Sequence, residues 1–350
     1  MKVLVTGHNG YVGSVMVPML QAAGHDVVGL DTYFFEGCTF GDAVPDIRAH
    51  RLDLRDVEPE HLAGSEAVIH LAALSNDPLG NLHAATTYAI NHGASVRLAR
   101  AAKAAGVSRF LFASSCSLYG VAGDGLLAED AAFNPITAYG ESKVRVEADV
   151  AILADDGFSP TYMRNATAYG VSPRLRADLV INNLVGYAIT TGKVQLQSDG
   201  TPWRPLVHVE DFSAAFIAAL HAPRDAVHNQ AFNVGLTEEN YQVRDLAEMV
   251  EAVVPGSSVT YAADAGPDPR SYRVDCSKLA TTLPEFRPQW TVSRGIEQVY
   301  EAFHRRRLTE DEFLSSRYLR IKRIRELLQS GHLDEALRWH TPVQSVQDVA

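Results

Sequence analysis

The chain has few cysteines, no excess of basic residues and no long apolar run. Its three cysteines, Cys38, Cys116 and Cys276, are far apart and lack C-x-x-C spacing, which predicts neither a disulfide framework nor a thiolate zinc site. Lys and Arg number 31 against 42 Asp and Glu, a net charge of −11, so a general nucleic-acid binder is not expected. The longest apolar stretches, Val68 to Leu74 and Ala214 to Leu220, are too short to cross a bilayer.

The N-terminal residues reach Gly7 before an apolar block could form, which predicts no secretory signal. With 350 residues, 46% of them hydrophobic, the chain has the composition of a globular protein of about two domains. We therefore expect a cytoplasmic protein with no metal site, no membrane partner and no nucleic-acid partner.

A βαβ unit opens the chain. An apolar run, Lys2 to Thr6, is followed by a glycine-rich turn, a helical pattern from Ser14 to Ala23 and a β-branched run from Asp26 to Leu30. Two further runs, Ala67 to Leu71 and Phe110 to Ser114, are apolar without alternation, as is typical of strands covered on both faces. Helical patterns from Asn91 to Ala105 and from Tyr139 to Leu153 separate or follow them. These elements predict a parallel α/β sheet.

After about residue 165 the chain becomes rich in proline, which predicts a smaller lobe with many loops. A helical pattern from Asp211 to Leu220 and a strand from Ala231 to Val234 indicate one return to the first lobe. The predicted fold class is α/β, a Rossmann-like doubly wound sheet with a smaller α/β substrate lobe and a C-terminal helical tail. The expected division is a first domain at 1–165, rejoined around 207–235, a second lobe at 166–206 and 236–308, and a helical extension at 309–350.

The glycines Gly7, Gly10 and Gly13 form a G-x-x-G-x-x-G turn between the first strand and helix. Such a turn lets a pyrophosphate approach the backbone at the positive end of a helix. Asp31 ends the next strand, where a carboxylate can accept hydrogen bonds from both ribose hydroxyls and would repel a 2′-phosphate. This pattern predicts a dinucleotide site and favours NAD over NADP, while the turn alone leaves a flavin open.

Tyr139 and Lys143 are four residues apart, so a helix places both side chains on one face. The polar stretch from Ser114 to Gly120 directly follows a buried strand, and parallel sheets place active sites at such strand ends. A tyrosine with a nearby lysine cation could lose its proton and act as a base on an alcohol, which is what hydride removal from a carbon that bears a hydroxyl requires.

In these motifs and their order, residues 1 to about 305 resemble the extended short-chain dehydrogenase/reductase family, which contains nucleotide-sugar epimerases and dehydratases. The resemblance implies that Ser115, Tyr139 and Lys143 are catalytic, with Ser115 bonding the oxygen that Tyr139 deprotonates. It implies NAD contacts from Gly7, Asn9, Gly10, Tyr11, Val12, Gly13, Asp31, Asp53, Leu54, Leu71, Ala72, Ala73, Asn91, Ser114, Tyr139, Lys143 and Asn165.

The two residues after Ser115 bear on the reaction. The family's 4,6-dehydratases resemble this core but carry an Asp-Glu pair there, whereas this chain has Cys116 and Ser117. The prediction is an NAD-dependent nucleotide-sugar epimerase, acting at C4 through a transient 4-keto sugar. A dehydratase, a 4-keto reductase or a C3/C5 epimerase in which the thiol of Cys116 acts as acid or base is the alternative. A noncatalytic NAD-binding regulatory protein is the alternative of another class.

The resemblance also implies that a nucleoside-diphosphate sugar binds the second lobe. Arg204 and Arg270 match family arginines that grip the diphosphate, and a guanidinium fork suits phosphate. The remaining substrate contacts are expected from Ser75, Ser117, Thr167 and Asn183. The chain departs from the family at Thr167, where asparagine is common, and at Ala265, where arginine is usual. A homodimer is expected.

The C-terminal segment carries a basic amphipathic pattern. From Thr309 to Gln329 a stripe that includes Phe313, Tyr318 and Ile324 predicts one helix, and Gly331 would end it. Its arginines, Arg320 among them, are expected on a solvated face. Such a helix could bind a membrane or a partner, but a helix packed on its own protein or on a second subunit is favoured.

Overall fold

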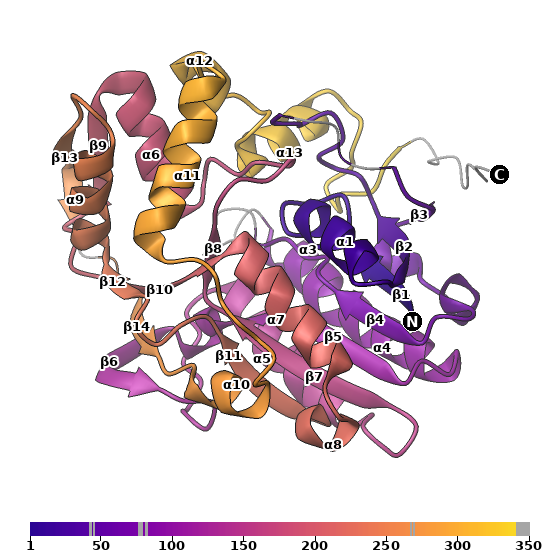
Figure 1. Cartoon of the computed structure of the whole chain (residues 1–350). Helices are drawn as coiled ribbons and strands as arrows, with labels where there is room; N and C mark the ends of the chain where they lie inside the picture. Colours follow the sequence, from indigo (N-terminus) through magenta and orange to yellow (C-terminus); the bar gives the residue numbers. More distant parts are fainter. Residues whose placement is uncertain are drawn as a thin grey trace.

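A seven-stranded parallel sheet forms the centre of the protein (Figure 1). The structure is a computed structural model that describes residues 1–41, 44, 46–75, 80, 83–266, 268 and 270–340. The strands, in their spatial order, are β11 (Gln230–Val234), β7 (Ser159–Asn165), β5 (Arg109–Ser115), β4 (Ala67–His70), β1 (Lys2–Thr6), β2 (Asp26–Asp31) and β3 (Ala49–Arg51). Every neighbouring pair is parallel. From β1 the chain adds β2 and β3 on one side of the sheet and then β4, β5, β7 and β11 on the other, so the direction in which strands are added reverses beside β1. The predicted Rossmann-like doubly wound sheet is confirmed.

Both faces of this sheet are covered, which explains why its strands are apolar without alternation. Val3 and Val5 of β1 belong to one buried cluster, and Leu4 between them belongs to another on the opposite face. Helices α1 and α7 contribute to the first cluster, and α4 and α5 to the second. Their bounds are α1 (Gly13–Ala22), α4 (Ala94–Ala104), α5 (Ala138–Ala151) and α7 (Val209–His221).

The opening βαβ unit and the helix of Tyr139 form as predicted, with bounds that differ by one or two residues. The helix predicted from Asn91 to Ala105 begins earlier, because α3 (Ala84–Tyr88) continues without a break through a π-helical turn, η3 (Ala89–Gly93), into α4. The chain returns to the main sheet through α7 and β11, as the sequence predicts. The other short elements are α8 (Arg224–Val227), α10 (Ser277–Thr282), η1 (Leu54–Asp56), η2 (Pro59–Leu62) and η4 (Cys116–Tyr119).

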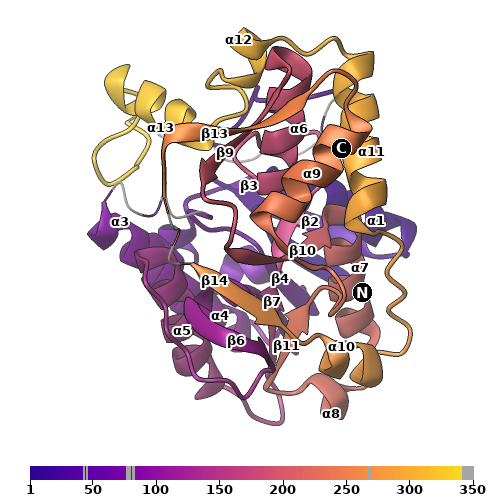
Figure 2. The same cartoon turned by 90° about the vertical axis from the view of Figure 1, so that its left-hand side faces the viewer.

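A second group of elements lies beyond the carboxyl ends of the main strands (Figures 1 and 2). Its helices α6, α9 and α11 share one buried core, which also receives Phe40, Phe313 and Tyr318. The helices are α6 (Val180–Thr191), α9 (Val243–Val253) and α11 (Val292–Arg305). Three small sheets join β8 (Thr167–Tyr169), β10 (Trp203–His208) and β12 (Asn240–Gln242); β9 (Lys193–Ser198) and β13 (Ser258–Gly266); and β6 (Val121–Leu127) and β14 (Ser271–Val274).

The C-terminal segment differs from the single helix that its pattern predicts. It forms two helices, α12 (Glu310–Phe313) and α13 (Arg320–Gln329), separated by non-helical residues. Tyr318 explains the break, because its side chain is buried in the second core and its carbonyl oxygen accepts a hydrogen bond from the amide of Ala177 at 3.0 Å. This bond and the burial of the ring tie Tyr318 to the second core between the two helices. Residues 341–350 of the expected extension lie outside the described residues.

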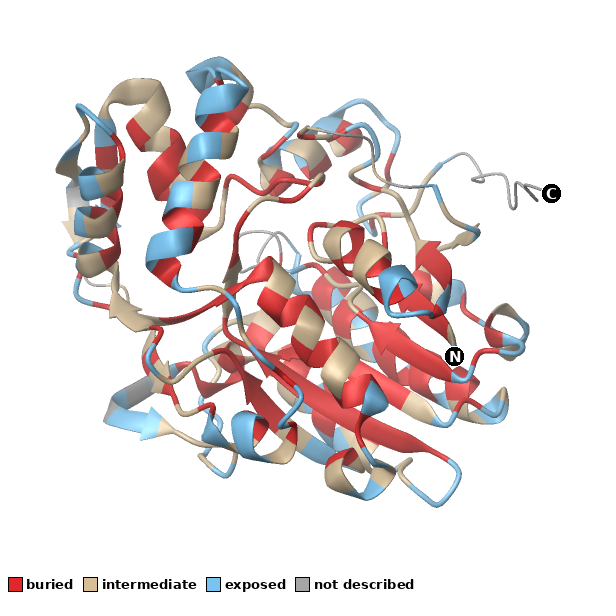
Figure 3. Ribbon diagram, in the orientation of Figure 1, coloured by how far each residue is buried: buried red, intermediate tan, exposed pale blue. Residues whose placement is uncertain are grey.

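Helix α13 packs on its own protein, the arrangement favoured from the sequence. Ile324 and Leu327 are buried against Phe34 and Leu74, which lie beyond β2 and β4. Figure 3 shows this inward face buried and the outer turns exposed. Among the described residues, no helix has the length and apolar character needed to span a bilayer.

Candidate functional site

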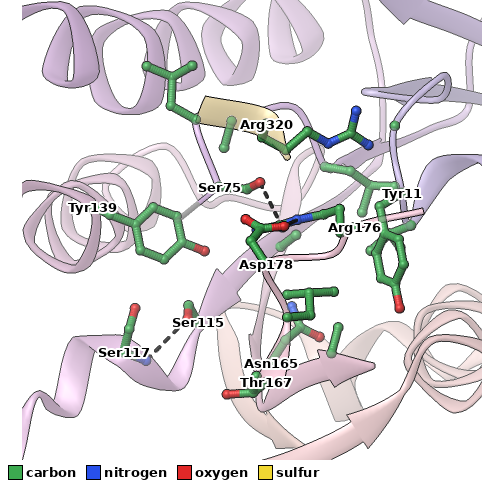
Figure 4. Close-up of a pocket in the computed structure, with 18 of the residues that line it drawn as sticks. Tyr11, Ser75, Ser115, Ser117, Tyr139, Asn165, Thr167, Arg176, Asp178 and Arg320 are labelled. Atoms are coloured by element: carbon green, nitrogen blue, oxygen red, sulfur yellow. Dashed lines mark hydrogen bonds and ion pairs between the residues drawn. The ribbon is translucent and has the colours of Figure 1, made fainter. Parts of the chain in front are cut away.

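A cavity of about 890 Å³ opens at the carboxyl ends of the parallel strands, between the main sheet and the second lobe. This is where doubly wound folds bind ligands. It is lined by every residue predicted for the site except Asn9, Asn91 and Cys116. Figure 4 shows Tyr139, Ser115, Ser117, Asn165 and Thr167 gathered around it from different elements.

The glycine turn lies at one end of the cavity, and its glycines are required by close backbone contacts. Gly7 has a φ of +73°, and a Cβ there would lie 2.9 Å from the amide nitrogen of Ala72. A Cβ on Gly13 would overlap the carbonyl oxygen of Gly7 and the Cα of His8. Only bare backbone fits, so the start of α1 remains accessible to a ligand phosphate.

Asp31, at the end of β2, lines the cavity and is held in place by the backbone. One carboxylate oxygen accepts a hydrogen bond from the amide of Asn9 at 3.0 Å, and the other accepts from the amide of Tyr33 at 2.8 Å. The side-chain oxygen of Asn9 accepts from Arg174 at 2.7 Å. Asn9 therefore positions Asp31 and does not line the cavity.

Asn91 also acts from behind the cavity wall. Its side-chain oxygen accepts from the amide of Leu74 at 2.8 Å, and its nitrogen donates to the Leu74 carbonyl at 3.1 Å. These two bonds hold the segment after β4, in which Leu71, Ala72 and Ala73 line the cavity.

The catalytic candidates come from two elements that meet at the cavity. Thr137 caps α5 by accepting from the amide of Gly140 at 3.1 Å, so Tyr139 and Lys143 lie one turn apart on the same face. Ser115 ends β5, and its hydroxyl accepts from the amide of Ser117 at 3.2 Å. The predicted triad is brought together around one space.

Lys143 is almost completely buried. Its Nζ donates to the carbonyl of Ala113 at 2.6 Å and lies 5.5 Å from the centre of the Tyr139 ring. Burial lowers the pKa of Lys143 to about 7, although the charge of Glu147 acts in the opposite direction. A proton on this lysine is therefore readily exchanged near neutral pH, beside the phenol that would lose its own.

A buried ion pair supports these residues from behind. Arg164 on β7 donates to Glu147 on α5, with an Nη2 to Oε2 distance of 2.7 Å, and both side chains are over nine-tenths buried. Glu147 also accepts from the hydroxyl of Ser114 at 2.5 Å. The pair fastens α5 to the strands that carry Ser115 and Asn165.

Beside Ser114 and Ser115, two polar atoms of cavity-lining residues have no hydrogen-bond partner among the described residues: the Oγ of Ser117 and the Oδ1 of Asn165. Both are buried, and burying such atoms without a partner is costly. The amide nitrogen of Asn165 already donates to Ser114 at 2.9 Å, which leaves Oδ1 to accept from a ligand. With the glycine turn and Asp31, this free acceptor fits NAD, whose carboxamide offers N–H donors.

Cys116 lies elsewhere. Its side chain is fully buried outside the cavity, in a cluster with Leu118, Tyr119 and Cys276. Its Sγ donates to the carbonyl of Arg164 at 3.1 Å, and burial raises the pKa of the thiol well above its usual value. The structure does not bring Cys116 to the cavity.

The two predicted diphosphate arginines meet at the far end of the cavity. Arg204 on β10 and Arg270 before β14 both form ion pairs with Asp268, at 2.8 and 2.6 Å. Two guanidinium groups thus share one carboxylate. Thr167 on β8 and Asn183 on α6 line the same cavity.

Four charged lining residues were missed by the sequence analysis: Arg176, Asp178, Asp268 and Arg320. Buried Arg176 forms an ion pair with half-buried Asp178 at 2.8 Å, and Arg176 also donates to the hydroxyl of Ser75 at 3.1 Å. Their position shortly after Gly170, in the run Arg174 to Asp178, is the signal that could have found them. Arg320, expected on a solvated face, is instead only 4% exposed and lines the cavity, which corrects that expectation.

Several known proteins are similar to this chain in sequence and fold. The model of the NAD dependent epimerase/dehydratase family matches residues 3–235. A UDP-glucose 4-epimerase of Corynebacterium glutamicum is 32% identical over 269 residues, covering 72% of this chain and 80% of that protein. A UDP-glucose 4-epimerase of Lactobacillus helveticus is 30% identical over 308 residues, covering 81% and 91%.

The solved structure of MoeE5 in complex with UDP-glucuronic acid and NAD is 29% identical, with a TM-score of 0.75, and covers 88% of this chain and 100% of its own. These matches span both the glycine turn and the Tyr139–Lys143 helix. The chain therefore belongs to the NAD dependent epimerase/dehydratase family, as an NAD-dependent enzyme of the extended short-chain dehydrogenase/reductase type.

Proposed function

We propose that the protein is an NAD-dependent nucleotide-sugar epimerase that inverts C4 of the sugar through a transient 4-keto intermediate. The observation that carries the proposal is the convergence of Ser115, Tyr139 and Lys143 in one cavity, without a carboxylic acid in the two positions after Ser115. The UDP-glucose 4-epimerases among its relatives and MoeE5, solved with UDP-glucuronic acid, support a nucleotide sugar as the substrate.

In this proposal the residues of the chain transfer the proton of the C4 hydroxyl. Tyr139 removes it from the C4 hydroxyl while Ser115 donates a hydrogen bond to the same oxygen, and the charge of protonated Lys143 stabilises the phenolate. The glycine turn, Asp31 and Asn165 would hold NAD, which would supply reversible hydride transfer at C4. For inversion, the 4-keto sugar must turn in the cavity so that the hydride returns to the opposite face of C4, and Tyr139 then gives the proton back to the C4 oxygen.

The substrate contacts are assigned to the second lobe. We propose that residues 166–206 and 236–308 hold the nucleotide sugar, with Arg204 and Arg270 on its diphosphate and Ser75, Ser117, Thr167 and Asn183 around it. The unpartnered hydroxyl of Ser117 supports a contact with a sugar hydroxyl. Cys116 is given no proton transfer, since it is buried outside the cavity.

The reaction is tested by incubating the purified full chain with UDP-glucose, UDP-glucuronic acid and the dTDP-, GDP-, CDP- and ADP-glucoses. The expected product, followed by chromatography and mass spectrometry, has unchanged mass and a different retention time. A product lighter by one water indicates a dehydratase, and stoichiometric consumption of added NADH indicates a reductase. Either result would overturn the epimerase proposal.

The role of Tyr139 is tested with Tyr139→Phe, which removes the phenol oxygen and retains the ring. Loss of a general base lowers kcat by roughly a hundred- to ten-thousandfold. The matched control is Tyr261→Phe, because Tyr261 is 55% exposed and does not line the cavity. If Tyr139→Phe leaves turnover at the wild-type rate, Tyr139 is not the base. If the wild-type chain itself turns over none of the nucleotide sugars, a noncatalytic NAD-binding protein gains support.

We also propose a cytoplasmic homodimer. Its three cysteines are free and buried, as in a reducing compartment, and the family resemblance implies the dimer. Size-exclusion chromatography with light scattering measures the assembly directly, and a mass of one chain would contradict it.

A further inference from the structure

Arg320 reaches the ligand cavity from a part of the chain that the family model does not match. It begins α13, far in sequence from the glycine turn and from the Tyr139 helix. In Figure 4 it lies on the side of the cavity that carries Arg176 and Asp178. Its side chain is held by two contacts: Nη2 donates to the carbonyl of Arg174 at 3.0 Å, and the guanidinium lies 3.8 Å from the centre of the Phe35 ring.

The other terminal nitrogen of Arg320, Nη1, is buried and has no hydrogen-bond partner among the described residues. An unpartnered nitrogen of a buried cation is costly and calls for an acceptor. The residue is only 4% exposed, so bulk water does not readily fill that role. Because the side chain lines the cavity, a bound ligand is the acceptor that the geometry provides.

The charges around Arg320 indicate which ligand fits. Arg174 and Arg176 are also buried, and the ion pair that the structure shows among these three arginines joins Arg176 to Asp178. Burial and the charge of Arg176 lower the pKa of Arg320 to about 9. This side of the cavity therefore carries a surplus of buried positive charge, which an anion would neutralise.

The place of Arg176 and Arg320 in the cavity indicates that this anion is a phosphate group. Arg176 lies within electrostatic reach of both Tyr11, in the glycine turn, and Tyr139. Its partner Ser75 follows the segment Leu71 to Ala73 that lines the cavity. A dinucleotide that extends from the glycine turn to Tyr139, with a nucleotide sugar beside it, brings a diphosphate past these arginines, and guanidinium groups bind phosphate oxygens in a fork.

We propose that Arg320, together with Arg176, binds a diphosphate group in this cavity, so that the C-terminal segment forms part of the ligand site. The inference rests on the proposed function for the presence of two diphosphate ligands. The phosphate oxygens belong either to NAD or to the nucleotide sugar.

The segment is anchored so that Arg320 is presented at this place. Trp339 donates to the carbonyl of Thr32, just after β2, at 2.8 Å, and Arg55 donates to the carbonyl of Ala336 at 2.7 Å. Arg338 forms an ion pair with Asp56. Together with the burial of Ile324 these contacts fasten residues 320–340 to the end of the cavity where Asp31 and Asp53 lie.

The test compares Arg320→Met with Arg325→Met in the full chain. Arg325 is exposed on the same helix, so its substitution controls for a change of charge and helix propensity. Protein stripped of nucleotide is titrated calorimetrically with NAD in one arm and with UDP, dTDP, GDP, CDP and ADP in the other. Arg320→Met should weaken one arm roughly ten- to hundredfold, the value of a charged hydrogen bond, while Arg325→Met leaves both unchanged.

The ligand whose affinity is reduced, NAD or a nucleoside diphosphate, identifies which phosphate Arg320 binds. Arg320→Lys, which keeps the charge and loses the fork, should restore part of the affinity. If both arms stay within twofold of wild type, or Arg325→Met weakens them equally, the proposal is overturned. Failure of the epimerase proposal is seen separately, as absence of sugar isomerisation by wild type whose NAD titration is unaffected.

Thermal unfolding without ligand separates binding from structural support. A ligand-binding Arg320 is a buried cation left uncompensated in the empty protein, so Arg320→Met should unfold at the same or a higher temperature than wild type. The measurement is repeated at a saturating concentration of the ligand whose affinity Arg320→Met weakened. Under that condition the wild type should unfold at the higher temperature, because it binds the ligand more tightly. A lower unfolding temperature in the empty protein, with unchanged affinities, would mean that Arg320 serves only to hold the fold.

Discussion

The buried pair between Arg164 and Glu147 should contribute far more to stability than an exposed pair on the same helix. Arg164 and Glu147 have side chains that are 6% and 8% exposed, joined by hydrogen bonds of 2.7, 3.1 and 3.2 Å. Arg145 and Glu141, also on α5, are 47% and 43% exposed and form an i,i+4 pair. One helix thus carries both the test pair and its control.

The two environments predict different magnitudes. Glu147→Gln keeps the shape of the side chain but leaves Arg164 as a buried charge without its counterion, which costs about 3–5 kcal/mol of unfolding free energy. Glu141→Gln leaves Arg145 in solvent, where an i,i+4 pair contributes only about 0.3–0.5 kcal/mol. The difference is large enough to measure in one denaturation experiment.

The assay is equilibrium urea unfolding of each single and double variant, without ligand, combined as a double-mutant cycle. The partners are replaced by Met at Arg164 and Arg145. The Arg164→Met/Glu147→Gln double variant should lose less than the sum of its single variants, because no charge is left unpaired. If Glu147→Gln costs less than about 1 kcal/mol, or both cycles give the same coupling energy, the reasoning from burial is wrong.

Three further predictions concern packing, pH and the thiol. Gly186→Ala should lower the unfolding free energy in urea by about 1–3 kcal/mol, because its Cβ would overlap the ring of Phe313, whereas Gly123→Ala, with open space around it, should not. Burial lowers the pKa of His70 to about 3. Below pH 6.5 this histidine is therefore protonated in the unfolded chain but not in the folded protein, and the free energy of unfolding decreases as the pH is lowered. His70→Gln should flatten this fall by about 1 kcal/mol per pH unit between pH 6.5 and about 3, measured by urea unfolding at pH 7 and 5, and an unchanged slope would exclude His70 as its cause. Cys116→Ser should leave kcat unchanged in the epimerisation assay, and a fall of a hundredfold or more would make the thiol an acid or base.

Local sequence was sufficient for the glycine turn and the helix of Tyr139. Gly7 and Gly13 are required by contacts within a short strand–turn–helix unit, so their spacing predicts that unit. Tyr139 and Lys143 share a face because helical periodicity relates residues four apart. The apolar strands likewise predict a sheet covered on both faces.

The roles of Cys116 and Arg320 could not be predicted in this way. A residue next to Ser115 in sequence points either into the cavity or behind the strand, and η4 directs the thiol of Cys116 into a buried cluster. The basic pattern of the C-terminal segment identified a polar side of a helix but not what covers it. The break at Tyr318 arises from a bond to Ala177, which is distant in sequence.

The sequence by itself determined the parallel α/β architecture, the NAD-binding turn and the proximity of Tyr139 to Lys143, since each depends on residues close together along the chain. The tertiary structure alone decided that Arg176, Asp178 and Arg320 converge on the same cavity. The physical reason is that periodicity specifies the neighbours of a residue within its own element. Whether a charged side chain meets water, a counterion or a ligand depends on which distant segments pack against it.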